Sequence, residues 1–156
     1  MRVNIRQSKD SEWKLIQKLN NFVFIADKDN DDDLDLNWPF SDKGIKYYKD
    51  LASGKWGHCL IAFSGKEAVG YVALAEKDFY GYRKSKYIEI ENIGVKTQYR
   101  SQGVGKKLMD AAIKWAKKVK ASKLYVSAYW GNKKAINFYK KNGFYEIGLE
   151  LDKKLN

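Results

Sequence analysis

A chain of 156 residues has the length of one domain, and 44% hydrophobic residues with 5 Trp, 11 Tyr and 7 Phe exclude a disordered chain. The net charge of +11 comes from 30 Lys and Arg against 19 Asp and Glu, and residues 42–156 carry this excess because residues 1–41 are slightly acidic. No apolar run is long enough to cross a bilayer and Cys59 is the only cysteine, so we expect one cytoplasmic domain, residues 1–156, without a signal peptide, membrane anchor or intrachain disulfide.

Hydrophobic periodicity and turn residues predict alternating strands and helices along the chain. The first half is predicted to contain a strand at 3–7, a helix that Ser8 or Asp10 caps and whose apolar face extends to about position 24, and an acidic loop at 27–35. A second short helix is predicted to start at Ser41 or Asp42 and to end near Gly54, and strands are predicted at 57–63 and 67–77. The second half is predicted to contain a strand at 86–95, a helix at 103–120, a strand at 123–129, a helix at 132–141 and a closing hairpin at 144–155. The 103–120 helix has one apolar side and one lysine-rich side, which predicts a helix packed on a sheet through a parallel crossover.

A loop with two glycines joins the 86–95 strand to the following helix, and its sequence is Arg100-Ser101-Gln102-Gly103-Val104-Gly105. Glycines let the backbone approach a ligand closely, and the first N–H groups of a helix are unpaired at the positive end of its dipole. Such a cradle suits the phosphates of a pyrophosphate. The spacing is not the longer dinucleotide fingerprint and no Gly-Lys-Ser/Thr follows, so nicotinamide and nucleoside-triphosphate cofactors are disfavoured.

A second pattern lies downstream and reads Asn132-Lys133-Lys134-Ala135-Ile136-Asn137-Phe138-Tyr139-Lys140-Lys141-Asn142-Gly143-Phe144. Locally it predicts a short helix that ends at Asn142-Gly143 before a strand begins. The two patterns, in this order, resemble the GNAT superfamily of N-acetyltransferases. In that superfamily an Arg/Gln-x-x-Gly-x-Gly/Ala loop binds the acetyl-CoA pyrophosphate, and an Asn-x-x-Ala-x-x-Phe-Tyr-x-x-x-Gly-Phe helix supplies a tyrosine near the thioester sulfur. The resemblance is strong over residues 57–155. For the first fifty-odd residues it rests only on the position and length of that part of the chain.

The resemblance implies an α/β fold in which a mixed, mostly antiparallel, twisted sheet of about six to seven strands is flanked by about four helices. It also implies acetyl-CoA as cosubstrate. By resemblance, the backbone N–H groups of Ser101 to Lys106 hold the pyrophosphate, and the pantetheine arm runs along the backbone of Ile93 and Val95. The N–H of Val95 then faces the thioester oxygen, where an oxyanion develops. The expected cofactor-contacting residues are Ile93, Val95, Arg100, Ser101, Gln102, Gly103, Val104, Gly105, Lys106, Asn132 and Tyr139.

Two glutamates are candidates for the general base. Alternation along the strand places Glu89 and Glu91 on one face, where their mutual repulsion favours a raised pKa for one of them. A raised pKa suits a carboxylate that accepts a proton near neutral pH. Glu91 is the expected base because it lies nearer the presumed thioester, and Glu89, acting directly or through water, is the alternative. A third interpretation is that both only bind substrate or water.

By resemblance, Tyr139 is the acid that protonates the departing thiolate, and a phenol of ordinary pKa suits this role. The alternative is that Tyr139 only packs its helix on the sheet. Asn132 is expected to cap that helix and, by resemblance, to hydrogen-bond the pantetheine. Direct attack by the amine is expected, because Cys59 has no evident base partner for a covalent route.

The acidic loop 27–35, followed by Trp38 and Phe40, lies on the acceptor side of a GNAT cleft by resemblance. An acidic rim beside aromatic rings suits a cationic amine such as a polyamine, an aminoglycoside or a basic peptide. A merely solvated loop is the alternative. The loop lacks the glycine and the glutamate of a calcium loop, so no metal site is predicted.

These observations predict an acetyl-CoA-dependent N-acetyltransferase whose acceptor is the primary amine of a cationic small molecule. The alternatives are a peptide or protein N-acetyltransferase and a non-catalytic, CoA-binding regulatory module. A nucleic-acid partner for the basic part of the chain is disfavoured, and no membrane partner is expected. Dimers are common in the superfamily, so a homodimer stays open, although no residue of the sequence indicates an interface.

Overall fold

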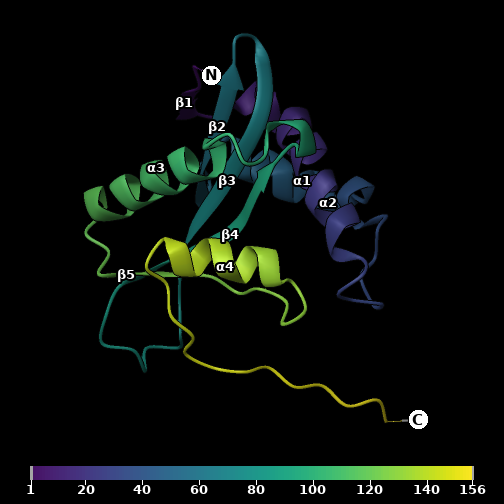
Figure 1. Cartoon of the computed structure of the whole chain (residues 1–156), viewed down its shortest axis with the longest axis vertical. Helices are drawn as coiled ribbons and strands as arrows, with labels where there is room; N and C mark the ends of the chain where they lie inside the picture. Colours follow the sequence, from purple (N-terminus) through teal and green to yellow (C-terminus); the bar gives the residue numbers. More distant parts are fainter. Residues whose placement is uncertain (1, 156) are drawn as a thin grey trace.

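The computed structural model describes residues 2–155 and contains one mixed sheet whose strands lie in the order β1-β2-β3-β4-β5 (Figure 1). The strands are β1 Asn4–Gln7, β2 Gly57–Ser64, β3 Glu67–Lys77, β4 Tyr87–Val95 and β5 Lys123–Tyr125. Neighbouring strands are antiparallel, except that β5 runs parallel to β4. The mixed, mostly antiparallel α/β fold and the parallel crossover are therefore confirmed.

Four helices accompany the sheet, as predicted: α1 Trp13–Asp27, α2 Asp42–Ala52, α3 Val104–Lys118 and α4 Lys133–Lys141. Single-turn 3₁₀ helices precede α1 (Asp10–Glu12), α2 (Trp38–Phe40) and α3 (Thr97–Tyr99). The hydroxyl of Ser41 caps α2 by accepting the N–H of Gly44 at 3.1 Å. Within residues 2–155, no helix is long and apolar enough to cross a membrane.

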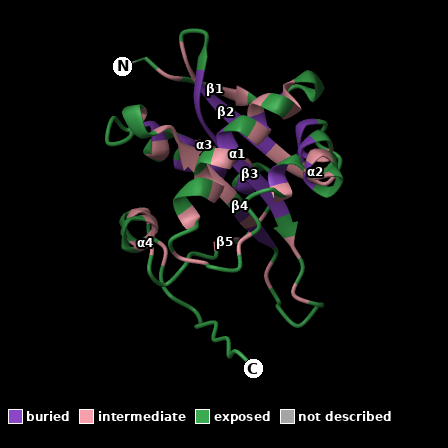
Figure 2. Cartoon of the chain, turned by 90° about the vertical axis from the view of Figure 1, so that its right-hand side faces the viewer, coloured by how far each residue is buried: buried purple, intermediate pink, exposed green. Residues whose placement is uncertain are grey.

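Helices cover both faces of the sheet, so its central strands are buried on both sides (Figure 2). On one face, α3 packs through Leu108 and Ala112 against β2, β3 and β4. On the other face, α1 and α2 pack through Ile16 and Leu51 against β2 and β3. This three-layer arrangement explains why β2 and β3 are continuously apolar rather than alternating.

A bulge in β4 separates this strand from β5. The pairing of β3 with β4 passes from Leu74 opposite Ile90 to Ala73 opposite Asn92, so Glu91 is an extra residue without an opposite partner. β5 pairs with β4 only over Tyr87–Glu89. Because a bulge bends its strand, the part of β4 after Glu91 does not follow β5. This part stays paired with β3, and its other edge is unpaired. The two parallel strands therefore diverge after Glu89, next to the bulge.

Over residues 2–155 the sheet has five strands, so the expectation of six to seven strands was wrong. The predicted hairpin at 144–155 is not formed, and the strand predicted at 123–129 ends at Tyr125. Residues 144–155 instead run away from the sheet (Figures 1 and 2). This segment does have the alternation of apolar and polar residues that suggested a strand. A strand also needs a neighbour with free backbone groups, however, and within residues 2–155 no strand pairs with this segment.

Candidate active site

The first turn of α3 is open to a ligand. Gly103 precedes it in the left-handed conformation, with φ +82°, and Ser101 has φ +58°. No side chain among residues 2–155 caps α3, and the N–H of Lys107 bonds to the carbonyl of Gly103 at 3.1 Å. The N–H groups of Val104, Gly105 and Lys106 therefore precede the first intrahelical bond. They form a set of donors at the positive end of a helix dipole, which is suited to a phosphate.

Gly105 joins the two sequence motifs in space. A Cβ atom at Gly105 would lie 3.3 Å from Cε2 of Phe138 on α4 and 4.0 Å from Cγ2 of Val95 on β4. The absence of a side chain therefore lets α3, α4 and β4 approach one another closely. The second glycine of the loop thus has a packing role, which sequence reasoning did not assign to it.

Other loop side chains are engaged with the protein itself. Arg100 donates from Nε to the carbonyl of Val95 at 2.9 Å, and Gln102 donates from Nε2 to the carbonyl of Gln98 at 2.8 Å. Lys106 forms an ion pair with Asp110 one turn along α3. These side chains hold the loop in shape, so the loop presents its backbone N–H groups as ligand donors.

The unpaired edge of β4 offers backbone groups at two predicted positions. The N–H of Lys96 donates to the carbonyl of Val69 on β3 at 2.9 Å. Because the backbone groups of successive residues in a strand point to alternate sides, those of Val95 and Ile93 point away from β3. They face the space where β4 and β5 diverge, and the carbonyl of Val95 accepts Arg100 from this side. An extended ligand can pair with this edge as a strand would.

The two predicted glutamates occupy different environments. Glu91 lies in the bulge, where its Oε2 accepts the hydroxyl of Tyr47 on α2 at 2.8 Å. Glu89 forms an ion pair with Lys77 at 3.0 Å. Loss of hydration is the main cause that raises the pKa of Glu91, the bond from Tyr47 opposes it, and the charge of Glu89 adds to it. The carboxyl beside the diverging strands therefore has the raised pKa that suits a base.

Tyr47 is a residue of the site that sequence reasoning missed. Its ring packs on Trp56, with 4.9 Å between ring centroids, and on Trp38, with 5.6 Å. Burial and the charge of Glu91 raise the pKa of Tyr47, so its hydroxyl keeps the proton that it donates. No motif in the sequence pointed to Tyr47, because its pairing with Glu91 spans 44 positions of the chain.

Tyr139 lies on α4 with its ring between Phe138, at 5.5 Å, and Phe144, at 5.6 Å. Burial, with a smaller effect of the charge of Asp27, raises the pKa of Tyr139 to about 12. The phenol is therefore protonated near neutral pH and can act as a proton donor. Asn132 caps α4 by accepting the N–H of Ala135 at 3.1 Å, as the sequence suggested.

The acidic loop forms part of a cavity of about 280 Å³ beside α1 and α2. Its apolar walls include the stacked rings of Phe24 and Trp38, 5.7 Å apart, and its acidic residues are Asp31, Asp33 and Asp35. Phe40 does not line it and is 56% exposed. Asp31 accepts the hydroxyl of Tyr129 at 2.7 Å, which joins the loop to the segment before α4. The cavity therefore combines aromatic surface with negative charge, and one of its acidic residues contacts the segment before α4.

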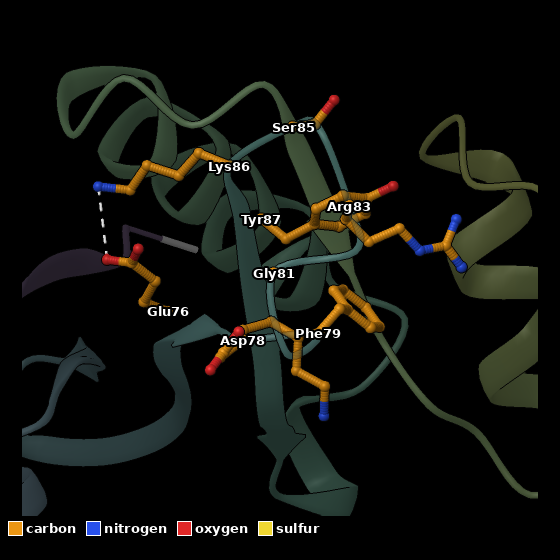
Figure 3. Close-up of a pocket in the computed structure, with 9 residues that line it drawn as sticks. Glu76, Asp78, Phe79, Gly81, Arg83, Ser85, Lys86 and Tyr87 are labelled. Atoms are coloured by element: carbon orange, nitrogen blue, oxygen red, sulfur yellow. Dashed lines mark ion pairs between the residues drawn. The ribbon is translucent and has the colours of Figure 1, made fainter.

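A second hollow, of about 250 Å³, lies where β3 leads into β4 (Figure 3). It is at the opposite end of β4 from Val95. Two of its basic side chains have local partners, since Lys86 pairs with Glu76 at 3.5 Å and Arg83 lies over the ring of Phe79 at 5.2 Å. Neither predicted base nor predicted acid lines this hollow.

The structure offers no thiolate for a covalent route. Cys59 is buried, and burial raises its pKa to about 12, so the thiol stays protonated near neutral pH. Across residues 2–155, no three His, Cys, Asp or Glu side chains gather in a way that could hold a metal ion.

Comparison with known proteins identifies the family. The protein-family model described as "Acetyltransferase (GNAT) family" matches residues 17–144 of this chain. The chain belongs to this family. An uncharacterized N-acetyltransferase of Archaeoglobus fulgidus is 30% identical over 128 residues, which cover 73% of this chain and 86% of that protein. An N-alpha-acetyltransferase of Sulfurisphaera tokodaii is 34% identical over 89 residues, which cover 52% of each chain. The protein is accordingly an acetyl-CoA-dependent N-acetyltransferase of the GNAT family.

A solved GNAT structure supports the fold over the whole chain. Aminoglycoside N-acetyltransferase AAC(6')-Iy, in complex with a bisubstrate analogue of CoA and acetylneamine, superposes with a TM-score of 0.78. The match covers 100% of this chain and 99% of that one, at 17% sequence identity.

Proposed function

We propose that this GNAT protein transfers the acetyl group of acetyl-CoA to the primary amine of a cationic small molecule by direct attack. The observation that carries the proposal is the bulge at Glu91, because it opens the edge of β4 and holds a carboxyl of raised pKa at that opening. The aspartate-lined cavity beside α1 and α2 supports a cationic acceptor. The fold shared with an enzyme that acts on aminoglycosides agrees with this acceptor class.

In the proposed complex, the pyrophosphate of acetyl-CoA binds the free N–H groups at the start of α3. The pantetheine amides pair with the outward backbone groups of Ile93 and Val95, as an added strand would. The N–H of Val95 donates to the thioester oxygen and stabilises the oxyanion that forms there. Asn132, which caps α4 through its side-chain oxygen, has an amide group left to donate to the pantetheine.

The proposed reaction is an acyl transfer without an enzyme-bound intermediate. Glu91 takes the proton of the acceptor's ammonium group, and the neutral amine nitrogen attacks the thioester carbonyl carbon. A C–N bond forms and the C–S bond breaks as the tetrahedral intermediate collapses. Tyr139 donates its proton to the departing sulfur, and the resulting phenolate takes the remaining surplus proton from the nitrogen of the intermediate, so that a neutral amide, the CoA thiol and the Tyr139 phenol result. Tyr47 holds the Glu91 carboxyl in position through its hydrogen bond.

A peptide α-amine is the second candidate acceptor, favoured by the relative named an N-alpha-acetyltransferase. The two acceptor classes separate in an assay of CoA thiol release. The acceptors to compare are spermidine, an aminoglycoside, a basic peptide with a free N-terminus and the same peptide with a blocked N-terminus. The proposal expects the highest kcat/KM with the polycations. Activity confined to the free peptide N-terminus would replace it with the peptide function.

Acetyl-CoA is expected to stabilise the protein against heat. A ligand at 100 times its Kd adds about 2.7 kcal/mol to the free energy of unfolding, and a domain of this size gains about 2–4 °C in Tm per kcal/mol. Differential scanning fluorimetry should therefore show a rise of several degrees with acetyl-CoA. NAD and ATP are the controls, and an equal rise with ATP would mean that the α3 N-terminus binds phosphates without selecting CoA.

Replacing Tyr47 with Phe is expected to shift the acidic limb of the pH profile of kcat/KM to higher pH. The hydrogen bond from Tyr47 lowers the pKa of Glu91, so its loss raises that pKa, and a base must be deprotonated to act. The phenylalanine ring keeps the packing on Trp56. Initial rates between pH 5 and 9 measure the shift. An acidic limb that does not move would show that Glu91 does not control the rate.

A further inference from the structure

Two segments that are distant in the sequence meet at the end of β4 opposite Val95. The N–H groups of Ser122 and Lys123 both donate to the carbonyl of Lys86, at 2.9 and 3.3 Å. These bonds join the turn between α3 and β5 to the loop between β3 and β4, residues 78–86. The 15 residues of α3 make it about 22 Å long, and this turn lies beyond its C-terminal end. The surface that the two segments form is therefore remote from the N–H groups proposed to hold the pyrophosphate.

This surface carries basic side chains that no acidic group neutralises. Six of them are exposed and are here called the basic surface: Arg83, Lys84, Lys117, Lys118, Lys120 and Lys123. In the described part of the chain, residues 2–155, none of the six forms an ion pair. The acidic residues of the adjoining hollow are Asp78 and Glu76, and Glu76 is already paired with Lys86. Unpaired charges of one sign gathered in this way attract a polyanion.

Exposed aromatic rings lie beside these charges in the loop between β3 and β4. Tyr80 is 95% exposed and Tyr82 is 68% exposed. Arg83 lies over the ring of Tyr82 at 5.5 Å, and its side chain extends away from the other residues of the hollow (Figure 3). The loop therefore presents flat rings and a guanidinium group to the solvent side by side, and both stack well on planar ligands.

The backbone of this loop is strained at Tyr80. Its φ is +55°, in the left-handed region that suits the next residue, Gly81, but costs energy for a residue with a bulky side chain. The Tyr80 ring lies in solvent, so burial of the ring does not offset this cost. Strained residues of this kind gather at functional sites, which indicates that the exposed ring has a role beyond folding.

We propose that the basic surface and the exposed rings of the loop between β3 and β4 bind single-stranded RNA. Lysine and arginine side chains bind the phosphates of a nucleic acid, and exposed aromatic rings stack on unpaired bases. RNA displays unpaired bases in its loops, whereas a duplex keeps its bases stacked within the helix. An acidic protein would match the charges but would leave the rings without a role.

The second segment is what changes the expectation drawn from the sequence. A lysine-rich helix face is usually only solvated, so the lysines near the end of α3 did not by themselves favour a nucleic-acid partner. The structure places Arg83, Lys84 and two exposed tyrosines next to them. Phosphate-binding charges and base-stacking rings together are the combination that a single strand requires.

Fluorescence anisotropy with a labelled single-stranded RNA tests the proposal on the full chain. The protein is expected to bind this RNA more tightly than the RNA duplex, the DNA strand of the same sequence or polyglutamate. Excess acetyl-CoA should not displace the RNA, because the two ligands bind at opposite ends of β4. Equal affinity for polyglutamate, a preference for the duplex or for DNA, or displacement by acetyl-CoA would each overturn the proposal.

Two double variants with the same loss of charge locate the binding site. Lys84→Gln with Lys123→Gln neutralises part of the basic surface, whereas Lys43→Gln with Lys66→Gln neutralises exposed lysines on α2 and in the turn between β2 and β3. For a single strand, each lost phosphate contact lowers the slope of log Kd against log salt concentration by about 0.7, so the first variant should lower it by about 1.4. The second should leave the slope nearly unchanged. Equal slopes in the two variants would refute a site at the basic surface.

Tyr82→Ala tests the stacking. It is expected to weaken RNA binding by about tenfold, because base–aromatic stacking contributes about this much, and to leave the affinity for polyglutamate unchanged. Tyr82 is exposed, so the fold should survive, which circular dichroism verifies. A variant that binds RNA as tightly as wild type would show that the ring takes no part and would overturn the proposal. These results do not depend on the acetyl acceptor or on Glu91 and Tyr139, so their failure would leave the proposed function untouched.

Discussion

Replacing Glu91 with Gln is expected to lower kcat by about 10²–10⁴-fold, because general-base catalysis contributes about this much and an amide cannot accept the proton. The KM for acetyl-CoA should stay unchanged, since Glu91 is not among the groups assigned to the cofactor. The fold should also survive. Glu91 is exposed at the surface, but partial loss of hydration raises its pKa in the folded protein, so its charged form is less favourable there than in the unfolded chain. This cost is absent below the unfolded pKa and is complete once the pH has risen past the folded pKa. Steady-state kinetics and Tm measure both effects.

Glu89→Gln is the matched control, because it is the same change two residues away on the same strand. Glu89 already forms an ion pair with Lys77 at 3.0 Å, so its loss should reduce kcat far less than the loss of Glu91. A larger loss of kcat in Glu89→Gln than in Glu91→Gln would assign the base to Glu89. Equal and small losses would mean that neither carboxyl takes the proton.

Tyr139→Phe is expected to lower kcat by about 10²-fold or more, because it removes the proposed proton donor to the leaving thiolate. The ring contacts with Phe138 and Phe144 remain, so Tm should change little. Burial raises the pKa of Tyr139 to about 12, so the wild-type phenol keeps its proton near neutral pH. A loss of activity just above neutral pH should therefore not come from ionisation of Tyr139. Stopped-flow measurement of thiol release tests the effect.

Two comparisons separate an acid from a packing residue. Tyr80→Phe makes the same change on an exposed loop residue and should leave kcat unchanged. With an acetyl thioester whose thiol is more acidic than that of CoA, the leaving thiolate needs less protonation. The difference in kcat between wild type and Tyr139→Phe should therefore be smaller with this thioester than with acetyl-CoA. If Tyr139→Phe retains full activity with acetyl-CoA, water or another group donates the proton and Tyr139 is a packing residue.

Local patterns predicted most of the fold. The apolar side of 103–120 and the helix start predicted at Ser41 or Asp42 each placed a helix within a few residues of its observed bounds, because period and caps act over neighbouring residues. The strands at 57–63 and 67–77 were found because continuous apolar runs bounded by turn residues are also local signals. The hairpin at 144–155 was not formed, because alternation records which side chains share a face and does not supply a paired neighbour.

The candidate site was predicted as a list of residues and only partly as an arrangement. The sequence indicated an open helix start behind Gly103 and two glutamates on one face of a strand. It did not indicate that Glu91 is the bulged residue, because a bulge depends on the register with β3. It did not indicate Tyr47, whose hydrogen bond to Glu91 joins α2 to β4. It also gave Gly105 no packing role, which depends on Phe138 of α4.

The sequence by itself determined the family, the order of the helices and most strands, and it supplied the residues proposed to carry the chemistry. These depend on composition, spacing and local backbone preference, which can be read directly from the amino-acid sequence. Only the tertiary structure decided which glutamate is held by Lys77 and which by Tyr47, and where β4 and β5 diverge. It also decided that, within residues 2–155, no strand pairs with residues 144–155. Register, desolvation and pairing between distant segments arise only when the sheet and its helices are packed together.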